Sequence, residues 1–288
     1  DSGLETSKTL RNDVKTTLIE LATANFKRVQ EALRTLEEVL KIENMYNLSK
    51  QYEEIRFNIY YLEKEFYNKL LANSKKEKLD SDLYCFTSEE YSKGRDNITV
   101  AKEMISAGIK IIQYREKCKK AKDMLKECQT IREITKNEKV TFIVNDYIDI
   151  ALSVSADGVH LGQDDLPLKK AREILGNEMI IGISTHSPEQ AMKAVKGGAD
   201  YIGVGPIFRT YTKKDVCEPV GLEYLQYVVE NIKIPFVAIG GIKEDNILSV
   251  KEKGAKCIAM VTEIVGADNI KEKINSIRKK IRKNEVIV

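Results

Sequence analysis

Residues 110–145 read KIIQYREKCKKAKDMLKECQTIREITKNEKVTFIVN, and this stretch carries the clearest signal of the fold. It begins with the apolar run Lys110–Tyr114, continues through a charged, amphipathic segment at 119–137, and returns to a second apolar run at Val140–Asn145. A continuous apolar run is typical of a strand buried on both faces, and a helix is the usual connection between two parallel strands. The stretch therefore predicts a strand–helix–strand unit with parallel strands.

The same alternation recurs on both sides of this stretch, with further amphipathic segments at 187–198 and 244–253. Eight repeats predict a closed (β/α)8 TIM barrel over 79–288. The competing open doubly wound sheet usually shows Gly-x-Gly-x-x-Gly after its first strand, and residues 87–91 read TSEEY instead. The eight runs are Leu83–Thr87, Lys110–Tyr114, Val140–Asn145, Gly158–Leu161, Ile180–Ser184, Tyr201–Gly205, Phe236–Ile239 and Cys257–Val261.

Residues 1–78 follow a helical pattern instead. Two apolar stripes with steps of three and four residues are separated by a polar stretch containing Asn44, Asn47 and Ser49, which predicts an α-helical hairpin before the barrel. The lysine-rich stretch 75–78 is expected to be a solvated linker. The stripes are Phe26, Val29, Leu33, Leu36 and Leu40, and Ile55, Ile59, Leu62, Phe66 and Leu70.

Two helices bury little apolar surface by themselves, so we expect this hairpin to pack on the barrel or on a neighbouring chain, which includes a homo-oligomer. The chain begins with Asp1 rather than methionine, so the hairpin is expected to be the end of a longer helical region.

The composition excludes several classes of function. Forty-seven basic and 44 acidic side chains give a net charge of +3, which is too balanced to favour nucleic acid as a partner. No apolar run approaches the roughly 18 residues of a membrane span, and no secretory signal is visible. Five scattered cysteines and only two histidines argue against a disulfide framework and a zinc site. We therefore expect a cytoplasmic protein that acts on small molecules.

Polar residues follow several of the predicted strands, and barrel active sites lie at those carboxyl ends. Alternation places Gln113, Arg115 and Lys117 on one side of the second strand, where a guanidinium and an ammonium suit a diphosphate. Carboxylates follow the third and fourth strands at Asp146 and Asp165, and they suggest Mg²⁺ shared with substrate phosphates. The pairs Asn145-Asp146 and Asp164-Asp165, to which these carboxylates belong, also fit a turn or the start of a helix, and the residues alone leave this alternative open.

A second anion site is predicted across the barrel. The stretch 205–215, GPIFRTYTKKD, is rich in hydroxyls and lysines and suits a loop that closes over an anion, although an ordinary solvated loop fits equally well. Gly240-Gly241 follows the seventh strand, where glycines let backbone N–H groups approach a phosphate or simply form a tight turn. Two anion sites suit the joining of phosphorylated small molecules.

These segments, taken in order, resemble thiamine-phosphate synthase (thiamine-phosphate pyrophosphorylase). The resemblance covers 82–270 and includes QYREK at 113–117, ND at 145–146, GVHLGQDD at 158–165, GISTH at 182–186, GPIF at 205–208, TYTKKD at 210–215 and GG at 240–241. The segment 24–38, ANFKRVQEALRTLEE, also resembles a helical extension that some longer members carry. Three positions depart from the family pattern, namely Tyr147, Arg209 and Thr262.

The resemblance implies a reaction and a set of site residues. A hydroxymethylpyrimidine diphosphate and a thiazole phosphate would be joined to thiamine phosphate with release of diphosphate, and Mg²⁺ would bind at Asp146 and Asp165. Arg115, Lys117, Ser184 and Lys213 would be the catalytic residues. The pyrimidine diphosphate would contact Gln113, Tyr114, Arg115, Glu116, Lys117, Asn145, Ser184 and Lys213. The thiazole phosphate would contact Thr210, Tyr211, Thr212, Gly241, Val261 and Thr262.

Two other functions remain possible from the sequence alone. A thiazole tautomerase has a similar barrel and moves protons with a histidine, a role open to His186. A non-catalytic protein that senses thiamine intermediates would use the helical hairpin for signalling. Neither alternative needs the basic residues of 113–117 together with Asp146 and Asp165.

Overall fold

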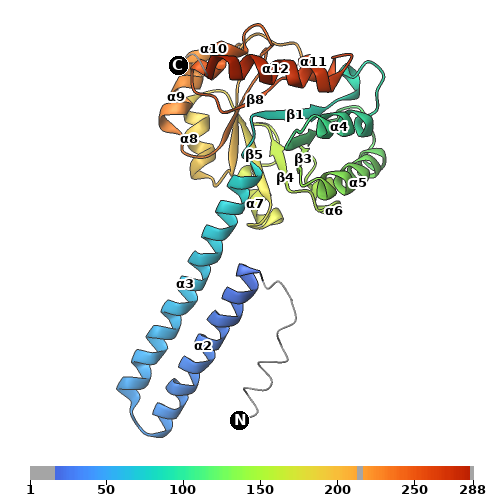
Figure 1. The fold of residues 1–288 in the computed structure, drawn as a ribbon. Coiled ribbons are helices and arrows are strands. Elements are labelled where there is room, and N and C mark those ends of the chain that lie inside the picture. Colours follow the sequence, from blue (N-terminus) through green and yellow to red (C-terminus); the bar gives the residue numbers. More distant parts are fainter. Residues whose placement is uncertain (1–16, 213–216, 286–288) are drawn as a thin grey trace. The chain divides into compact units, whose positions relative to one another are not determined.

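The computed structural model describes residues 17–212 and 217–285 (Figure 1). Contacts along the chain divide it into two compact units, Asp1–Asn73 and Ser74–Val288. Each unit is described by itself below.

The first unit contains the predicted helical hairpin, formed by α2 (Leu18–Ile42) and α3 (Tyr46–Lys78), whose last turn belongs to the second unit. Thr17 and Glu20 close the start of α2 with a reciprocal capping box. The connection is shorter than the sequence suggested, because Asn47 and Ser49 lie inside α3. The Ser49 hydroxyl is buried and donates to a backbone carbonyl of α2 at 3.1 Å, which explains a polar residue at a helical position.

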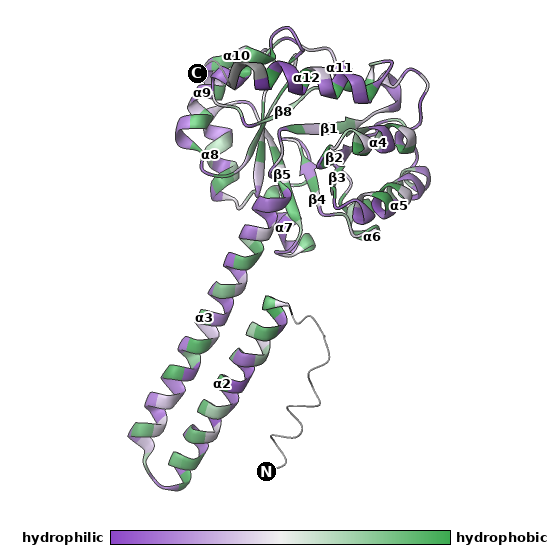
Figure 2. Cartoon of the chain, viewed as in Figure 1, coloured by the Kyte–Doolittle hydropathy of each residue, from purple (hydrophilic) through white to green (hydrophobic). Residues whose placement is uncertain are grey.

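Hydrophobic and hydrophilic residues alternate along both α2 and α3 (Figure 2), and residues of both kinds make the contacts between the two helices. The rings of Phe26 and Phe66 pack 5.8 Å apart, and the buried Glu37 carboxylate accepts from Arg56 at 3.0 Å. The predicted apolar stripes are only partly buried between the two helices, because this pairing leaves some of their residues exposed. Val29, Leu36, Ile55 and Leu62 are between 43% and 54% exposed.

The second unit is a closed barrel of eight parallel strands in sequential order, with β8 pairing back onto β1 (Figure 1). This confirms the (β/α)8 prediction, and most strands agree with the predicted runs to within a residue at each end. The strands are β1 (Leu83–Thr87), β2 (Ile111–Tyr114), β3 (Thr141–Asn145), β4 (Gly158–Leu161), β5 (Ile180–Thr185), β6 (Tyr201–Val204), β7 (Phe236–Ile239) and β8 (Cys257–Ala259).

Helices cover the outside of the barrel. A 3-10 turn, η1 (Glu89–Tyr91), precedes the first of them, and one difference from the prediction lies after β8, where Val261 begins a short helix rather than ending the strand. The helices are α4 (Asn97–Ser106), α5 (Ala121–Asn137), α6 (Ile148–Ser153), α7 (Leu168–Leu175), α8 (Pro188–Lys196), α9 (Gly221–Asn231), α10 (Ile247–Glu252), α11 (Val261–Val265) and α12 (Ile270–Glu285).

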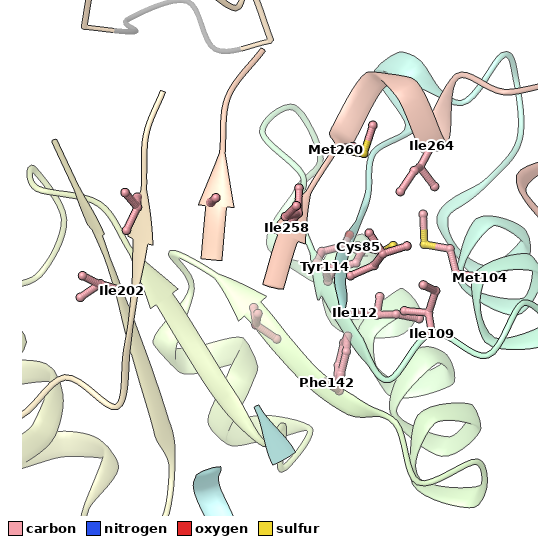
Figure 3. Close-up of a cluster of buried hydrophobic side chains, with 14 of the residues drawn as sticks. Cys85, Met104, Ile109, Ile112, Tyr114, Phe142, Ile202, Ile258, Met260 and Ile264 are labelled. Carbon is pink, nitrogen blue, oxygen red and sulfur yellow. The ribbon is translucent and has the colours of Figure 1, made fainter. Parts of the chain in front are cut away.

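Alternation along each strand separates two cores. Tyr84 and Phe86 belong to the cluster inside the barrel, whereas Leu83 and Cys85 belong to the larger cluster between the strands and the helices. Figure 3 shows part of the outer cluster, which includes Tyr114 of β2. A barrel whose interior is filled in this way is a packed core, and space for a ligand remains only at its ends.

The last turn of α3 and the residue after it close the amino end of the barrel. The prediction of a solvated linker at 75–78 is wrong for the linker and for Lys75, because these residues end α3 and Lys75 is only 8% exposed, with its ammonium 3.0 Å from Asp200. The other three residues are exposed, as predicted. Lys78 pairs with Asp157 at 2.6 Å, and buried Leu79 joins the interior cluster. Lys75 is buried and Lys78 remains exposed, and both are held by carboxylates that lie just before β6 and β4.

The five cysteines are all free. Among residues 17–212 and 217–285, no helix is both long and apolar enough to cross a membrane.

Candidate active site

A cavity of about 540 Å³ lies at the carboxyl ends of the strands, and all eight strands contribute to its lining. Predicted residues from distant parts of the sequence meet there. They are Gln113, Arg115, Lys117, Asn145, Asp146, Asp165, Ser184, Thr210, Tyr211, Thr212, Gly241, Val261 and Thr262. Lys213 lies outside the described residues.

The segment after β2 forms a basic wall of the cavity. Gln113, Arg115 and Lys117 face the cavity, as the alternation predicted. Tyr114 and Glu116 belong to the opposite face and do not line the cavity. The Tyr114 hydroxyl donates to Glu127 at 2.7 Å, and the Glu116 carboxylate accepts from Asn97 at 2.9 Å and from the backbone of Glu89 at 3.0 Å.

Two carboxylates lie beside this basic wall. Asp146 forms an ion pair with Lys117, and Asp165 accepts from the backbone N–H of Gly162 at 2.6 Å. Asp146 has a left-handed backbone with φ 63°, which is uncommon for a residue with a side chain and is often found at functional sites. Burial raises the pKa of the Asp146 carboxyl, Lys117 opposes this effect, and neighbouring Asp165 adds to it.

The loop after β6 forms the opposite wall together with Gly240 and Gly241. Both glycines have left-handed backbones, with φ 98° and 64°. A Cβ on Gly241 would lie 2.5 Å from the carbonyl oxygen of Arg209 and 2.6 Å from that of Phe208, so only glycine fits there. The glycine therefore makes room for the loop itself, and Gly241 also lines the cavity, so a role of its backbone N–H in binding a phosphate stays a prediction.

Two hydroxyls of this loop interact with each other, since the side-chain oxygens of Thr210 and Thr212 are 3.1 Å apart. The Tyr91 hydroxyl donates to the Thr212 carbonyl at 3.2 Å and ties the loop to the segment after β1. Val261 and Thr262 line the cavity from the first turn of α11. The loop and α11 therefore bring hydroxyl groups and backbone to one side of the cavity.

Sequence reasoning missed a buried group of polar side chains on the cavity floor. Gln113 donates to the Tyr84 hydroxyl at 2.8 Å, which lies 2.8 Å from the Tyr201 hydroxyl. His160 Nδ1 is 2.9 Å from Tyr201, and its Nε2 is 2.9 Å from the hydroxyl of Ser184. The signal available in the sequence was a tyrosine in each of two strands that are otherwise apolar, because a buried phenol requires a hydrogen-bond partner.

Comparison with known proteins agrees with the barrel fold and with the family resemblance of the sequence. A family model described as thiamine monophosphate synthase matches residues 83–264, and one described as the ThiD2 family matches 1–65. The thiamine-phosphate synthase of Pelotomaculum thermopropionicum is 63% identical over 207 residues, which cover 72% of this chain and 95% of that protein. The enzyme of the same name from Lawsonia intracellularis is 58% identical, over 70% of this chain and 94% of that protein. The solved thiamine phosphate pyrophosphorylase from Pyrococcus furiosus superposes with a TM-score of 0.65 at 35% identity and covers 72% of this chain and 98% of that one.

Proposed function

This chain belongs to the thiamine monophosphate synthase family, and from that premise we propose that it joins a pyrimidine and a thiazole into thiamine phosphate. The substrates are 4-amino-2-methyl-5-(diphosphomethyl)pyrimidine and thiazole phosphate. The bond between the pyrimidine methylene carbon and the diphosphate oxygen breaks, and its electron pair leaves with the diphosphate. The thiazole nitrogen then supplies the electron pair of the new carbon–nitrogen bond. The observation that carries this proposal is one cavity with a basic, carboxylate-edged wall opposite a hydroxyl-rich wall.

Arg115 and Lys117 neutralise the diphosphate as negative charge grows on it. Both side chains line the cavity, and a guanidinium beside an ammonium is a favourable arrangement for a polyanion. Ser184 donates a hydrogen bond to the same group, and Gln113 and Asn145 orient the pyrimidine diphosphate from the cavity floor. We assign Lys213 to the diphosphate as well, so Lys213→Ala is expected to lower kcat on the order of 100-fold.

Asp146 and Asp165 are the residues that fit Mg²⁺. The described residues contain no cluster of three or more potential metal ligands, but Mg²⁺ commonly uses only one or two carboxylates together with water and substrate phosphates. The raised pKa of Asp146, due to burial and in part to Asp165, indicates that a further positive charge is favourable there. When bound, Mg²⁺ supplies positive charge that stabilises the departing diphosphate.

The opposite wall holds the thiazole phosphate. Its hydroxyls and backbone come from Thr210, Tyr211, Thr212, Gly241, Val261 and Thr262, all of which line the cavity. The charge of this phosphate does not change during the reaction, so the wall anchors and aligns the thiazole nitrogen.

Measurement of diphosphate release tests this function. Purified protein with both substrates and Mg²⁺ should release one diphosphate per thiamine phosphate formed. A thiazole tautomerase or a non-catalytic sensor of thiamine intermediates would release none, so the absence of diphosphate would contradict the proposal.

The setting of the enzyme is also a proposal. Free cysteines suit a reducing compartment, so we assign the protein to the cytoplasm. The apolar side chains that α2 and α3 expose support our expectation that the hairpin contacts another element, either the barrel or a second chain in a homo-oligomer. Size measurement by light scattering distinguishes the two.

A further inference from the structure

Five side chains form a continuous hydrogen-bonded chain across the cavity floor. The chain runs from β2 through β1 and β6 to β4 and β5, and each contact is 2.8 or 2.9 Å long. Its members are Gln113, Tyr84, Tyr201, His160 and Ser184. The two tyrosines and Gln113 are each 1% exposed, so bulk water does not replace these contacts.

Glycines make room for this chain. A Cβ on Gly182 would lie 2.1 Å from the ring of Tyr201, and a Cβ on Gly203 would lie 3.3 Å from the imidazole of His160. The two rings are 5.4 Å apart between centroids. The absence of side chains at Gly182 and Gly203 therefore leaves room inside the barrel for the rings of Tyr201 and His160.

The direction of the hydrogens in the chain follows from the orientation of the Gln113 amide, whose Nε2 faces the Tyr84 hydroxyl. Gln113 donates to the Tyr84 oxygen, so the Tyr84 hydrogen is available only for Tyr201. The Tyr201 hydroxyl then donates to Nδ1 of His160, which leaves the imidazole hydrogen on Nε2, pointing at the Ser184 oxygen. Burial raises the pKa of both tyrosines, so both keep the hydrogen that this order requires.

The opposite direction is less favourable for two reasons. A hydrogen on Nδ1 would make Tyr201 donate to Tyr84, and the buried Tyr84 hydrogen would then lack an acceptor while Gln113 donates to the same oxygen. Ser184 would also donate to His160 and present only lone pairs to an anion in the cavity.

We infer that Tyr84 and Tyr201 are positioning residues, which hold His160 with its hydrogen on Nε2 and thereby leave the Ser184 hydroxyl hydrogen for the departing diphosphate. This inference rests on the proposed function only in naming the diphosphate. The buried Gln113 Oε1 has no partner within the described protein, so it remains an acceptor for an N–H of the substrate. An N–H donated to this atom keeps the Gln113 amide, and with it the whole chain, in the same orientation.

The tautomer of His160 is measurable in the free protein at neutral pH by ¹⁵N NMR of the imidazoles. The sequence contains only two histidines, and His186 provides an internal reference. Its Nδ1 lies 2.5 Å from the Gly205 carbonyl oxygen, which only accepts, so His186 carries a hydrogen on Nδ1. We expect opposite tautomers for the two residues, and a His186→Gln variant assigns the signals. A hydrogen on Nδ1 of His160, alone or together with one on Nε2, would overturn the inference.

Tyr201→Phe breaks the chain at its centre. We expect the ¹⁵N chemical shifts of His160 to move towards the values of an imidazole that exchanges between its two tautomers. We also expect kcat to fall on the order of 10-fold, which is the size expected for loss of a hydrogen bond to a charged group. The KM for thiazole phosphate should stay within about twofold. Tyr84→Phe should also lower kcat.

Tyr224→Phe is the matched control, because the Tyr224 hydroxyl is also buried and donates to Thr185 at 2.8 Å, outside the cavity. It should change neither the tautomer nor kcat. An unchanged tautomer and kcat in Tyr201→Phe would also overturn the inference. If the wild-type protein released no diphosphate, the proposed function would fail instead, whatever the tautomer.

Discussion

Gln113 and Tyr114 are neighbours in β2 with opposite surroundings, because alternate residues of a strand point to opposite faces. Gln113 lines the cavity, whereas Tyr114 lies in the core between strands and helices. Alternation alone predicted this separation, and it accounts for the absence of Tyr114 and Glu116, which the family resemblance had included, from the cavity lining. At the scale of single residues, the two-residue repeat of a strand therefore predicts which face of the sheet a side chain occupies.

Asp146→Asn is expected to reduce activity at least ~100-fold while keeping the fold. Because burial raises the pKa of this carboxyl above its ordinary value of 3.8, the ionised form is less favourable in the folded state. At neutral pH the Asn variant should therefore melt at a higher temperature than wild type in the absence of Mg²⁺. The pKa of Asp146 is higher in the folded state than in the unfolded state. As the pH falls from the folded-state value towards the unfolded-state value, folded wild type takes up a proton at Asp146, so the difference in melting temperature between the variant and wild type should shrink.

Melting curves at several pH values and turnover assays check this prediction. Mg²⁺ with diphosphate should raise the melting temperature of wild type more than that of the variant, because the variant lacks one of the two metal-binding carboxylates. Asp149→Asn is the control, since Asp149 is exposed on α6 and should alter neither property. Near-normal turnover of Asp146→Asn at limiting Mg²⁺ would contradict the assignment.

Gly241→Ala tests the packing of the loop after β6. The new methyl group would collide with the carbonyls of Phe208 and Arg209 and displace the loop. We expect the KM for thiazole phosphate to rise about tenfold, because this wall anchors that substrate, and kcat to fall by a smaller factor, because the same loop sequence carries Lys213. Gly176→Ala is a matched control, with a similar φ of 68° and open space around its Cβ position. Its backbone, with φ 68° and ψ -171°, is strained for a residue with a side chain, so the variant should cost about 1–3 kcal/mol of stability and leave kinetics unchanged.

At the element scale, the strands were predictable and the ends of the helices were not. Buried parallel strands read as apolar runs, and these runs match β1, β4 and β7 without change. The last turn of α3 escaped prediction because its lysines look solvated in sequence, and only the fold brings Asp157 and Asp200 to them. For the same reason the buried polar chain through Tyr84 and Tyr201 was not predicted, since its partners come from separate strands.

Leu79→Ala tests whether this junction is part of the barrel core. Leu79 is 6% exposed and packs in the interior cluster, so its truncation should lower the free energy of unfolding by about 3 kcal/mol. Urea unfolding of the full chain measures this loss. Ile174→Ala is the control, because Ile174 is 55% exposed on α7 and should cost less than about 0.5 kcal/mol. Equal losses in both variants would mean that Leu79 does not support the barrel.

At the scale of the whole molecule, the two compact units meet at Asn73 and Ser74, whereas the change of periodicity suggested a boundary at 78/79. The change from helical to strand periodicity marks where the secondary structure changes, whereas the compact barrel unit begins at Ser74, inside α3. The barrel family match, residues 83–264, lies wholly within this unit, and its relatives are covered almost completely without most of the first unit. We therefore predict that residues 17–73 are dispensable for the barrel fold and that residues 74–79 are not.

Two truncated chains separate these contributions. A chain that begins at Ser74 keeps the ion pairs of Lys75 and Lys78 and the buried Leu79, so it should unfold cooperatively with kcat within about twofold of the full chain. A chain that begins at Asp80 loses all three, and of the cations that the described residues pair with Asp200 it keeps only Arg172. It should therefore be less stable by at least the ~3 kcal/mol of one lost core leucine. Urea unfolding and steady-state kinetics of both chains check this prediction. Equal stability would show that the last turn of α3 adds nothing to the barrel, whereas a stable but inactive chain from Ser74 would place the preceding helices in the active site.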